Sequence, residues 1–143
     1  MIRSLFRHRP RGRRGQALVE MTLLAPILLL LIMAVWEFGR AWNVYQTMTD
    51  AAREGARMSV VANADPTLPT DVVETTIHNA LAAAKIDTTQ VLINKSGFRL
   101  GIGVPSLVSI TLPYQFGVVG YLLSWTTGQK SITMNTTVLM RNE

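Results

Sequence analysis

The sequence contains no cysteine, which excludes a disulfide framework and any cysteine-ligated metal site. Charge is also scarce, because Asp, Glu, Lys and Arg make up 16% of the 143 residues, against roughly a quarter in a typical soluble domain. Histidine occurs only at His8 and His78, and the sequence has no HExxH, GxSxG or P-loop motif. These absences predict a protein that is not an enzyme and that has no cofactor and no metal site.

Acidic residues are missing from the N-terminal segment. That segment carries six of the 14 basic residues, and the remaining eight are matched by nine acidic residues. The pI of about 10.2 therefore reflects the N-terminal segment and not the rest of the chain. An arginine cluster beside an apolar run follows the positive-inside rule, so we expect a membrane protein and no nucleic-acid partner. The arginines are Arg3, Arg7, Arg9, Arg11, Arg13 and Arg14.

Residues 17–36 form an apolar run whose one charge is Glu20. A helix of about 20 residues is roughly 30 Å long, the thickness of the hydrocarbon core of a membrane. The alternative is a cleaved secretory signal, which has a shorter apolar region followed by a small-x-small site. Residues 37–42 supply no such site. We expect an anchor in contact with membrane lipid, with residues 1–15 cytoplasmic and the C-terminal part outside.

The helix is expected to continue beyond the membrane to about Val61, before Asn63 and Asp65-Pro66. Two neighbouring stripes with helical spacing support this, one polar and one that begins aromatic and ends small. At 1.5 Å per residue, residues 16–61 span about 69 Å, more than twice the hydrocarbon core. The polar stripe is Arg40, Asn43, Thr47, Asp50, Glu54 and Arg57, and the other is Phe38, Trp42, Tyr45, Thr49, Ala52 and Ala56.

Residues 62–143 are expected to form a small extracytoplasmic domain. Asp71 to Lys85 has the spacing of a second helix, with Asp71 and Glu74 as a capping box. Period-two alternation predicts strands at 107–114 and 131–140, with a shorter one at 91–93. Residues 117–128 fit either a long apolar loop or a short helix. The predicted fold class is α+β: a long membrane-spanning helix that continues outside the membrane, a second short helix and a small antiparallel sheet packed on it.

The boundary between the basic leader and the apolar run carries a recognisable motif. The leader ends at Gly15, and Glu20 follows five residues later inside the apolar helix. The stretch from Gly15 to Pro26 resembles the TadE-like family of pseudopilins from tight-adherence (Tad) type IV pilus systems. The resemblance continues in residues 37–40 and 51–57 and returns weakly in residues 107–114 and 138–141. Gln16 stands where type IV pilins usually have an aromatic residue, and the chain is longer than the major pilins of these systems, which favours a minor pilin.

The resemblance implies a precursor in the bacterial inner membrane that a prepilin peptidase processes between Gly15 and Gln16. It also implies a role in assembling or initiating an adhesive pilus, with other pilins and the inner-membrane assembly platform as partners. The alternative is an uncleaved, single-pass membrane-anchored binding module. Cleavage after Gly15 separates the two hypotheses.

Glu20 is the first candidate for an assembly residue. A carboxylate inside a membrane helix costs about 2.5–3.5 kcal/mol on insertion scales, so a partner is expected. Cleavage would place a new ammonium group at Gln16, about 6 Å along the helix from Glu20. The resemblance implies that Glu20 pairs with the Gln16 ammonium of a neighbouring subunit. The alternative is that its side chain extends to the lipid headgroups.

Pro26 and the small residues further along are candidates for helix packing. Pro26 leaves the carbonyl of Thr22 without its usual donor, which favours a kink. It is either relevant to assembly or a tolerated proline of a membrane helix. Ala52, Gly55 and Ala56 allow another element to approach closely. We expect them to pack against the chain's own domain, and the alternative is a subunit interface.

Overall fold

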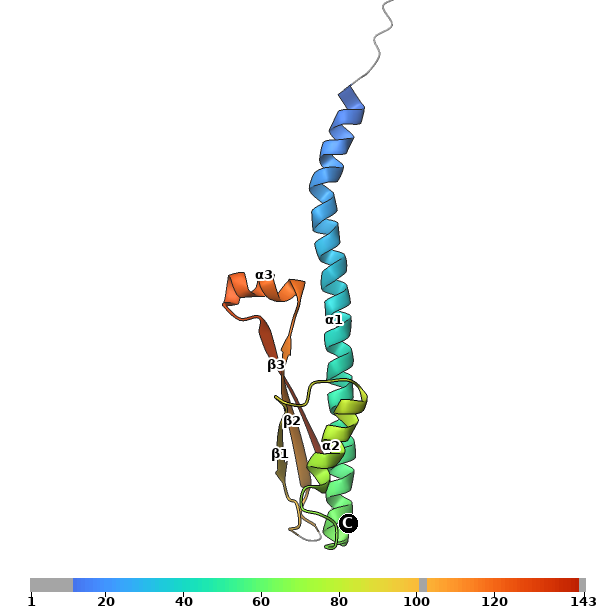
Figure 1. The fold of residues 1–143 in the computed structure, drawn as a ribbon, viewed down its shortest axis with the longest axis vertical. Coiled ribbons are helices and arrows are strands. Elements are labelled where there is room, and N and C mark those ends of the chain that lie inside the picture. The colour runs from blue at the N-terminus through green and yellow to red at the C-terminus, as the bar shows by residue number, and fades with distance from the viewer. Residues whose placement is uncertain (1–11, 101–102, 142–143) are drawn as a thin grey trace, which may run out of the picture.

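A single helix dominates the molecule. The computed structural model describes residues 12–100 and 103–141, so most of the predicted leader at 1–15 lies outside the described residues. Helix α1 (Gly12–Ala64) has 53 residues and is about 80 Å long (Figure 1). The predicted continuous helix is confirmed, and it ends three residues beyond the expected Val61. It stops because the Asp65 carboxylate accepts a hydrogen bond from the Thr67 backbone N–H (3.0 Å) and Pro66 cannot continue a helix.

The two halves of α1 have different surroundings. The N-terminal half projects alone, and the domain packs along the C-terminal half (Figure 1). The most apolar stretch of α1 has a mean hydropathy of 2.5, and none of it is buried within the protein. Among the described residues, α1 is the one helix long and apolar enough to cross a membrane. Its properties are those of a single-pass membrane anchor.

The domain contains two further helices and a sheet. Along the chain these are α2 (Val72–Ala83), β1 (Leu92–Ser96), β2 (Ser106–Gln115), α3 (Val118–Thr127) and β3 (Ser131–Met140). The described strands form one antiparallel sheet in the order β1-β2-β3. In its central strand, Ile110 is opposite Ile93 on one side and Thr136 on the other. The predicted α+β class is confirmed.

The core lies between the sheet, α1 and α2. Strand β2 alternates as predicted, because its even-numbered residues Val108, Ile110 and Leu112 are buried. They pack with Val73, Ile77 and Leu81 of α2 and with Met48, Ala51, Ala52 and Ala56 of α1. The short side chains of α1 let both α2 and the sheet approach its backbone. A buried hydrogen bond between the Ser59 and Ser106 hydroxyls also joins α1 to the start of β2.

Two local predictions for the domain require correction. The first strand was expected at 91–93 but covers Leu92–Ser96. It is an edge strand whose last three residues, Asn94, Lys95 and Ser96, are polar, so the apolar run marks only its beginning. The capping box at Asp71 and Glu74 is wrong, because Asp71 makes no side-chain cap bond. Glu74 instead forms an ion pair with Lys95 of β1, with 3.1 Å between Oε1 and Nζ.

The ambiguous segment at 117–128 is a helix. Helix α3 ends at Gly128, whose φ of +73° lies in the left-handed region that glycine adopts without strain. The Gly128 N–H donates to the Ser124 carbonyl at 3.0 Å and closes the last turn. Helix α3 runs across the direction of α1, at the end of the sheet nearer the projecting half of α1 (Figure 1).

We expect Gly55→Leu to destabilise the domain by about 1–3 kcal/mol. A Cβ atom at Gly55 would lie 2.6 Å from Ile77 Cδ1 and 2.7 Å from Cγ1, so a leucine displaces Ile77 from the core. The helix-propensity gain is smaller, at most about 1 kcal/mol. Thermal unfolding and limited proteolysis of the full chain in detergent measure the effect. Gly39→Leu is the matched control, because a Cβ there meets nothing within 4 Å. Equal stability of the two variants would contradict the close packing.

Candidate functional site on helix α1

The predicted processing site lies within the first turns of α1. Gly15 and Gln16 are helical and exposed, as is Glu20 one turn later. The helix begins at Gly12, so the Gly15–Gln16 peptide bond is part of a regular helix in the unprocessed chain. A peptidase that cuts this bond must therefore open the first turns of α1 locally. Residues 1–11 of the arginine-rich leader lie outside the described residues.

Glu20 has one hydrogen bond in the described part of the chain. The Gln16 side-chain amide donates to Glu20 Oε1 at 3.0 Å. A neutral amide does not neutralise a carboxylate, so this contact leaves the charge of Glu20 in an apolar helix face. The geometry also shows that positions 16 and 20 lie on the same helix face within reach of each other. An ammonium group at Gln16, created by cleavage, would arise beside this carboxylate.

Pro26 lies inside the projecting half of α1, and the helix continues through it. The proline has no N–H to donate to the carbonyl of Thr22, one turn earlier. The Thr22 hydroxyl donates to the Leu18 carbonyl at 2.8 Å, so this polar side chain is satisfied within its own helix. The surface around Pro26 consists of exposed apolar side chains, among them Leu23, Leu24 and Ile27.

The small residues of α1 pack inside the domain. Ala52 and Ala56 have no exposed surface, and Gly55 lies against Ile77 and Val73 of α2. Their contacts are with the chain's own domain, which was the expected arrangement. The small residues therefore fix the domain to α1, and the exposed apolar side chains of α1 lie mainly in its projecting half.

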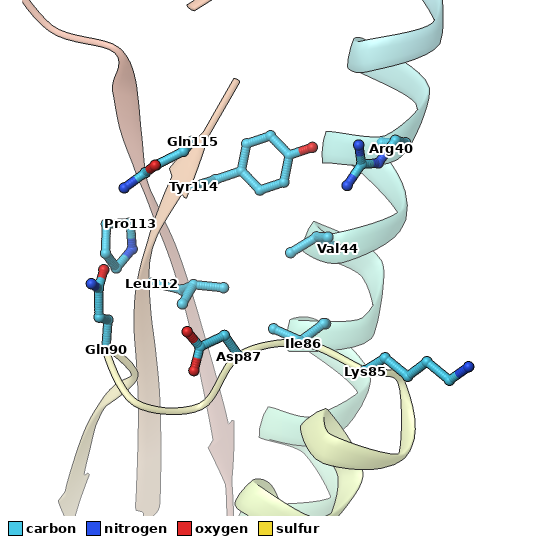
Figure 2. Close-up of a pocket in the computed structure, with 10 residues that line it drawn as sticks. All are labelled: Arg40, Val44, Lys85, Ile86, Asp87, Gln90, Leu112, Pro113, Tyr114 and Gln115. Carbon is cyan, nitrogen blue, oxygen red and sulfur yellow. The ribbon is translucent and has the colours of Figure 1, made fainter. Parts of the chain in front are cut away.

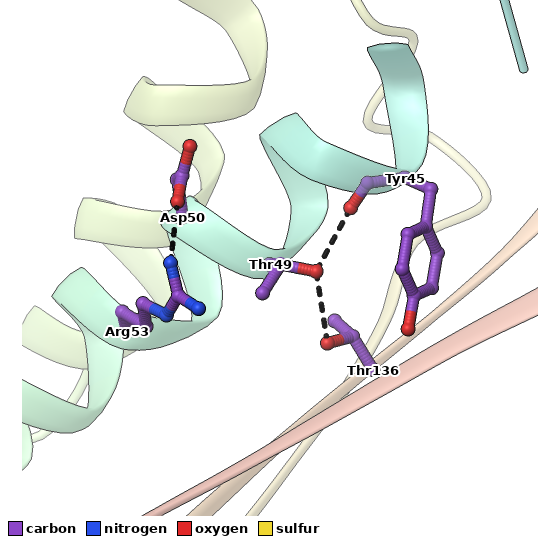
Figure 3. Close-up of polar contacts among 5 residues, drawn as sticks. All are labelled: Tyr45, Thr49, Asp50, Arg53 and Thr136. Atoms are coloured by element: carbon purple, nitrogen blue, oxygen red, sulfur yellow. Dashed lines mark hydrogen bonds and ion pairs between the residues drawn. The ribbon is translucent and has the colours of Figure 1, made fainter. Parts of the chain in front are cut away.

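Polar contacts in the domain half of α1 join it to β3 and pair two of its own side chains (Figure 3). The Thr49 hydroxyl donates to the Tyr45 carbonyl at 2.9 Å. Because its single hydrogen is used there, the Thr136 hydroxyl of β3 donates to Thr49 across 3.3 Å. Arg53 pairs with Asp50, three residues earlier in the same helix, at 3.1 Å. This ion pair is exposed and contributes at most about 1 kcal/mol.

A second exposed pair, Glu54 with Arg57, follows one turn later. Arg57 Nε donates to Glu54 Oε2 at 3.0 Å. The hydrogen bond from Arg57 lowers the pKa of the Glu54 carboxyl below its ordinary value. Both side chains are solvated, so the pair orients the surface of α1 and contributes little to stability.

Sequence reasoning missed the role of Glu37. This residue follows the apolar run directly, yet it is only 5% exposed. Its two carboxylate oxygens accept hydrogen bonds from the backbone N–H groups of Val118 and Val119, the latter at 3.0 Å. Glu37 therefore caps the N-terminus of α3, where the helix dipole favours a negative charge. Gly117 permits this approach, because a Cβ there would lie 2.7 Å from Glu37 Oε1.

A shallow cleft lies between α1, the loop after α2 and the end of β2 (Figure 2). Its cationic side chains are Arg40 and Lys85, and Asp87 supplies a carboxylate. Two hydrogen bonds from Thr89, first from its backbone N–H and then from its hydroxyl, lower the pKa of the Asp87 carboxyl. The described residues hold no group of three or more metal-ligating side chains. The remaining lining residues are Val44, Ile86, Gln90, Leu112, Pro113, Tyr114 and Gln115.

Comparison with known proteins gives a family match that lies within helix α1. Residues 15–57 match the family model described as TadE-like protein. The match begins at the predicted processing glycine and covers Glu20, Pro26, Glu37 and the small residues up to Ala56. It confirms the resemblance over this segment, and the domain beyond residue 57 lies outside it. No curated protein matches the chain. No solved structure matches it either.

Proposed function

Because this chain carries a TadE-like segment over residues 15–57, which associates it with Tad pilus systems, we propose that it is a pseudopilin or minor pilin. In this proposal a prepilin peptidase removes the leader after Gly15, and the mature protein takes part in assembling or initiating an adhesive pilus. The single observation that carries the proposal is the position of the family motif. Gly15 and Glu20 lie at the start of one uninterrupted helix whose apolar half is exposed along its length.

The shape of the molecule supports a structural and interaction role and not a catalytic one. The projecting half of α1 presents apolar side chains on all sides, so it suits lipid before assembly and other pilin helices after it. The domain is held at the far half of α1 and leaves the first half free for helix–helix contacts (Figure 1). The proposed partners are other pilins, the prepilin peptidase and the assembly platform of the inner membrane.

The orientation is part of the proposal. The arginine-rich leader remains in the cytoplasm according to the positive-inside rule, so α1 crosses the inner membrane and the domain is extracytoplasmic. The Gly15–Gln16 bond then lies at the cytoplasmic interface, where a membrane-embedded prepilin peptidase reaches it. The same orientation places Glu20 about one helical turn inside the membrane.

Processing provides the direct test. When the full chain is expressed with its cognate prepilin peptidase, we expect the membrane form to begin at Gln16. Mass spectrometry of the intact protein reads the new N-terminus and also shows whether its α-amino group is free. A peptidase with an inactivated catalytic site is the control and should leave Met1 or the formylated precursor. Recovery of the uncleaved form alone with active peptidase would favour the uncleaved, membrane-anchored binding module.

A further inference from the structure

Helix α3 lies at the level where the apolar run of α1 ends. Its N-terminus is bound to Glu37, one residue after Trp36. Just before that point, Val119 of α3 shares an apolar groove with Ala34 and Val35 of the membrane-spanning run. Helix α3 extends from this attachment across the direction of α1, so it runs along the membrane surface if α1 spans the bilayer (Figure 1). The inference therefore rests on the membrane location of α1.

The exposed face of α3 is apolar. Val118, Tyr121, Leu122 and Trp125 follow helical spacing and form one stripe, which we call the α3 stripe. All four residues are exposed, and Trp125 is 93% exposed. A helix of a water-soluble domain normally turns such a stripe toward its core, whereas the α3 stripe is exposed.

The opposite face of α3 contacts Phe116 and Lys130, the residues that link it to β2 and β3. Gly120 is buried, and a Cβ there would lie 3.2 Å from the Lys130 carbonyl oxygen and 3.3 Å from Phe116 Cβ. Gly120 lies nearly half a turn around the helix from the centre of the α3 stripe. Because the sheet extends from α3 away from the projecting half of α1, the stripe faces the side of that apolar half (Figure 1). In a membrane, this is the lipid side.

The serine and threonine hydroxyls of α3 are hydrogen-bonded within the protein. The Ser124 hydroxyl donates to the Tyr121 carbonyl at 2.8 Å, and the hydroxyls of Thr126 and Thr127 donate to the Leu123 carbonyl at 3.0 and 2.8 Å. The first amides of the helix donate to Glu37. These hydroxyls and amides therefore do not have to be stripped of water when this helix enters a less polar phase.

The charge around α3 suits an anionic headgroup layer. Residues 88–142 contain no Asp or Glu, and the Glu37 carboxylate at the start of α3 is buried against the first amides of the helix. The Lys130 ammonium lies 4.2 Å from the centre of the Tyr121 ring, so a cation flanks the α3 stripe. Tyrosine and tryptophan favour the membrane–water interface because their rings are apolar and their polar atoms reach water.

We propose that α3 is an interfacial helix whose stripe is seated in the bilayer leaflet that faces the domain. Val118, Leu122 and Trp125 enter the upper acyl region, and Lys130 contacts anionic headgroups. The protein then holds the membrane at two places, through α1 and through α3. Two attachments fix the rotation of the domain about α1, which a single helix alone does not. A protein partner would also cover an apolar stripe, but the position of α3 beside the apolar run specifies lipid.

Single-tryptophan forms of the full chain test this proposal. The Trp125 form carries Trp36→Phe and Trp42→Phe and is reconstituted in vesicles of phosphatidylcholine and phosphatidylglycerol. We expect its emission to be shifted to the blue and protected from aqueous iodide. Lipids brominated near the top of the acyl chains should quench roughly half of it. Iodide-accessible emission that the brominated lipids do not quench would overturn the proposal.

Two further forms separate the possible failures. A form that retains Trp36 reports on the anchor, so lipid quenching of Trp36 without quenching of Trp125 overturns the α3 proposal alone. Unquenched Trp36 would overturn the anchor together with it. Leu139→Trp in a tryptophan-free background is the matched control, because Leu139 is 62% exposed near the far end of β3 and should remain accessible to iodide. Protection of Trp125 that grows with protein density, without lipid quenching, would assign the stripe to a protein contact and overturn the proposal.

Discussion

Replacing Glu37 with alanine is expected to release the N-terminal turn of α3 from α1. The carboxylate accepts hydrogen bonds from two backbone N–H groups in a site that is only 5% exposed, and alanine leaves both donors without an acceptor. Hydrogen bonds to a charged group contribute about 1.5–3 kcal/mol, which corresponds to roughly a 10- to 100-fold change in the opening equilibrium. We expect the amides of Val118 and Val119 to exchange faster by this factor, measured by hydrogen–deuterium exchange in detergent micelles.

Glu37→Gln and Glu54→Ala make this prediction specific. The glutamine retains one carbonyl acceptor and the shape of the side chain, so its effect on α3 should be smaller. Glu54→Ala removes a carboxylate from the same helix, at a position that pairs with Arg57 of α1. It should leave the exchange of α3 unchanged. Exchange rates at Val118 and Val119 that are the same in Glu37→Ala and in the unaltered chain would show that the apolar contacts of Val119 suffice to hold α3.

The long helix and the sheet could be predicted because their periodicity is complete within the sequence. The polar stripe of α1 and the alternation of β2 both repeat over several turns or residue pairs, so a local pattern determines each element. β3 begins and ends at the predicted residues for the same reason. The shorter edge strand β1 was misplaced because Asn94, Lys95 and Ser96 carry no apolar signal, although they pair with β2.

The contact between Glu37 and α3 could not be predicted from local pattern, because it joins residues 81 and 82 positions apart in the chain. A weaker signal was present: a carboxylate directly after an apolar run needs a partner, as Glu20 does. Helix α3 was ambiguous because it is only 10 residues long and mostly apolar, so periodicity alone did not separate a short helix from an apolar loop. The ion pair of Glu74 with Lys95 could not be predicted either, because Lys95 lies in another element.

The last prediction concerns Glu20, whose replacement with glutamine keeps the shape of the side chain and removes its charge. We expect Glu20→Gln to insert normally, because a more apolar helix partitions into the bilayer at least as well. Cleavage after Gly15 should also continue, since the leader and the glycine are unchanged. Association with other pilins should fail, because the Gln16 ammonium of a neighbouring subunit loses its charged partner. Cross-linking or co-purification with the major pilin measures this, together with a count of surface pili.

Glu54→Gln is the matched control for Glu20→Gln. It removes one carboxylate charge from the same helix, but in the domain half, where Glu54 is solvated and pairs with Arg57. Normal association in this control and loss of association in Glu20→Gln would locate the effect in the membrane segment. The structure also offers Glu20 a partner within its own chain, because the Gln16 side-chain amide lies 3.0 Å from Glu20 Oε1. If the chain's own Gln16 were the only partner, the glutamine variant would retain a hydrogen bond at that position. Normal association and normal piliation would then follow and show that Glu20 only orients its own helix end.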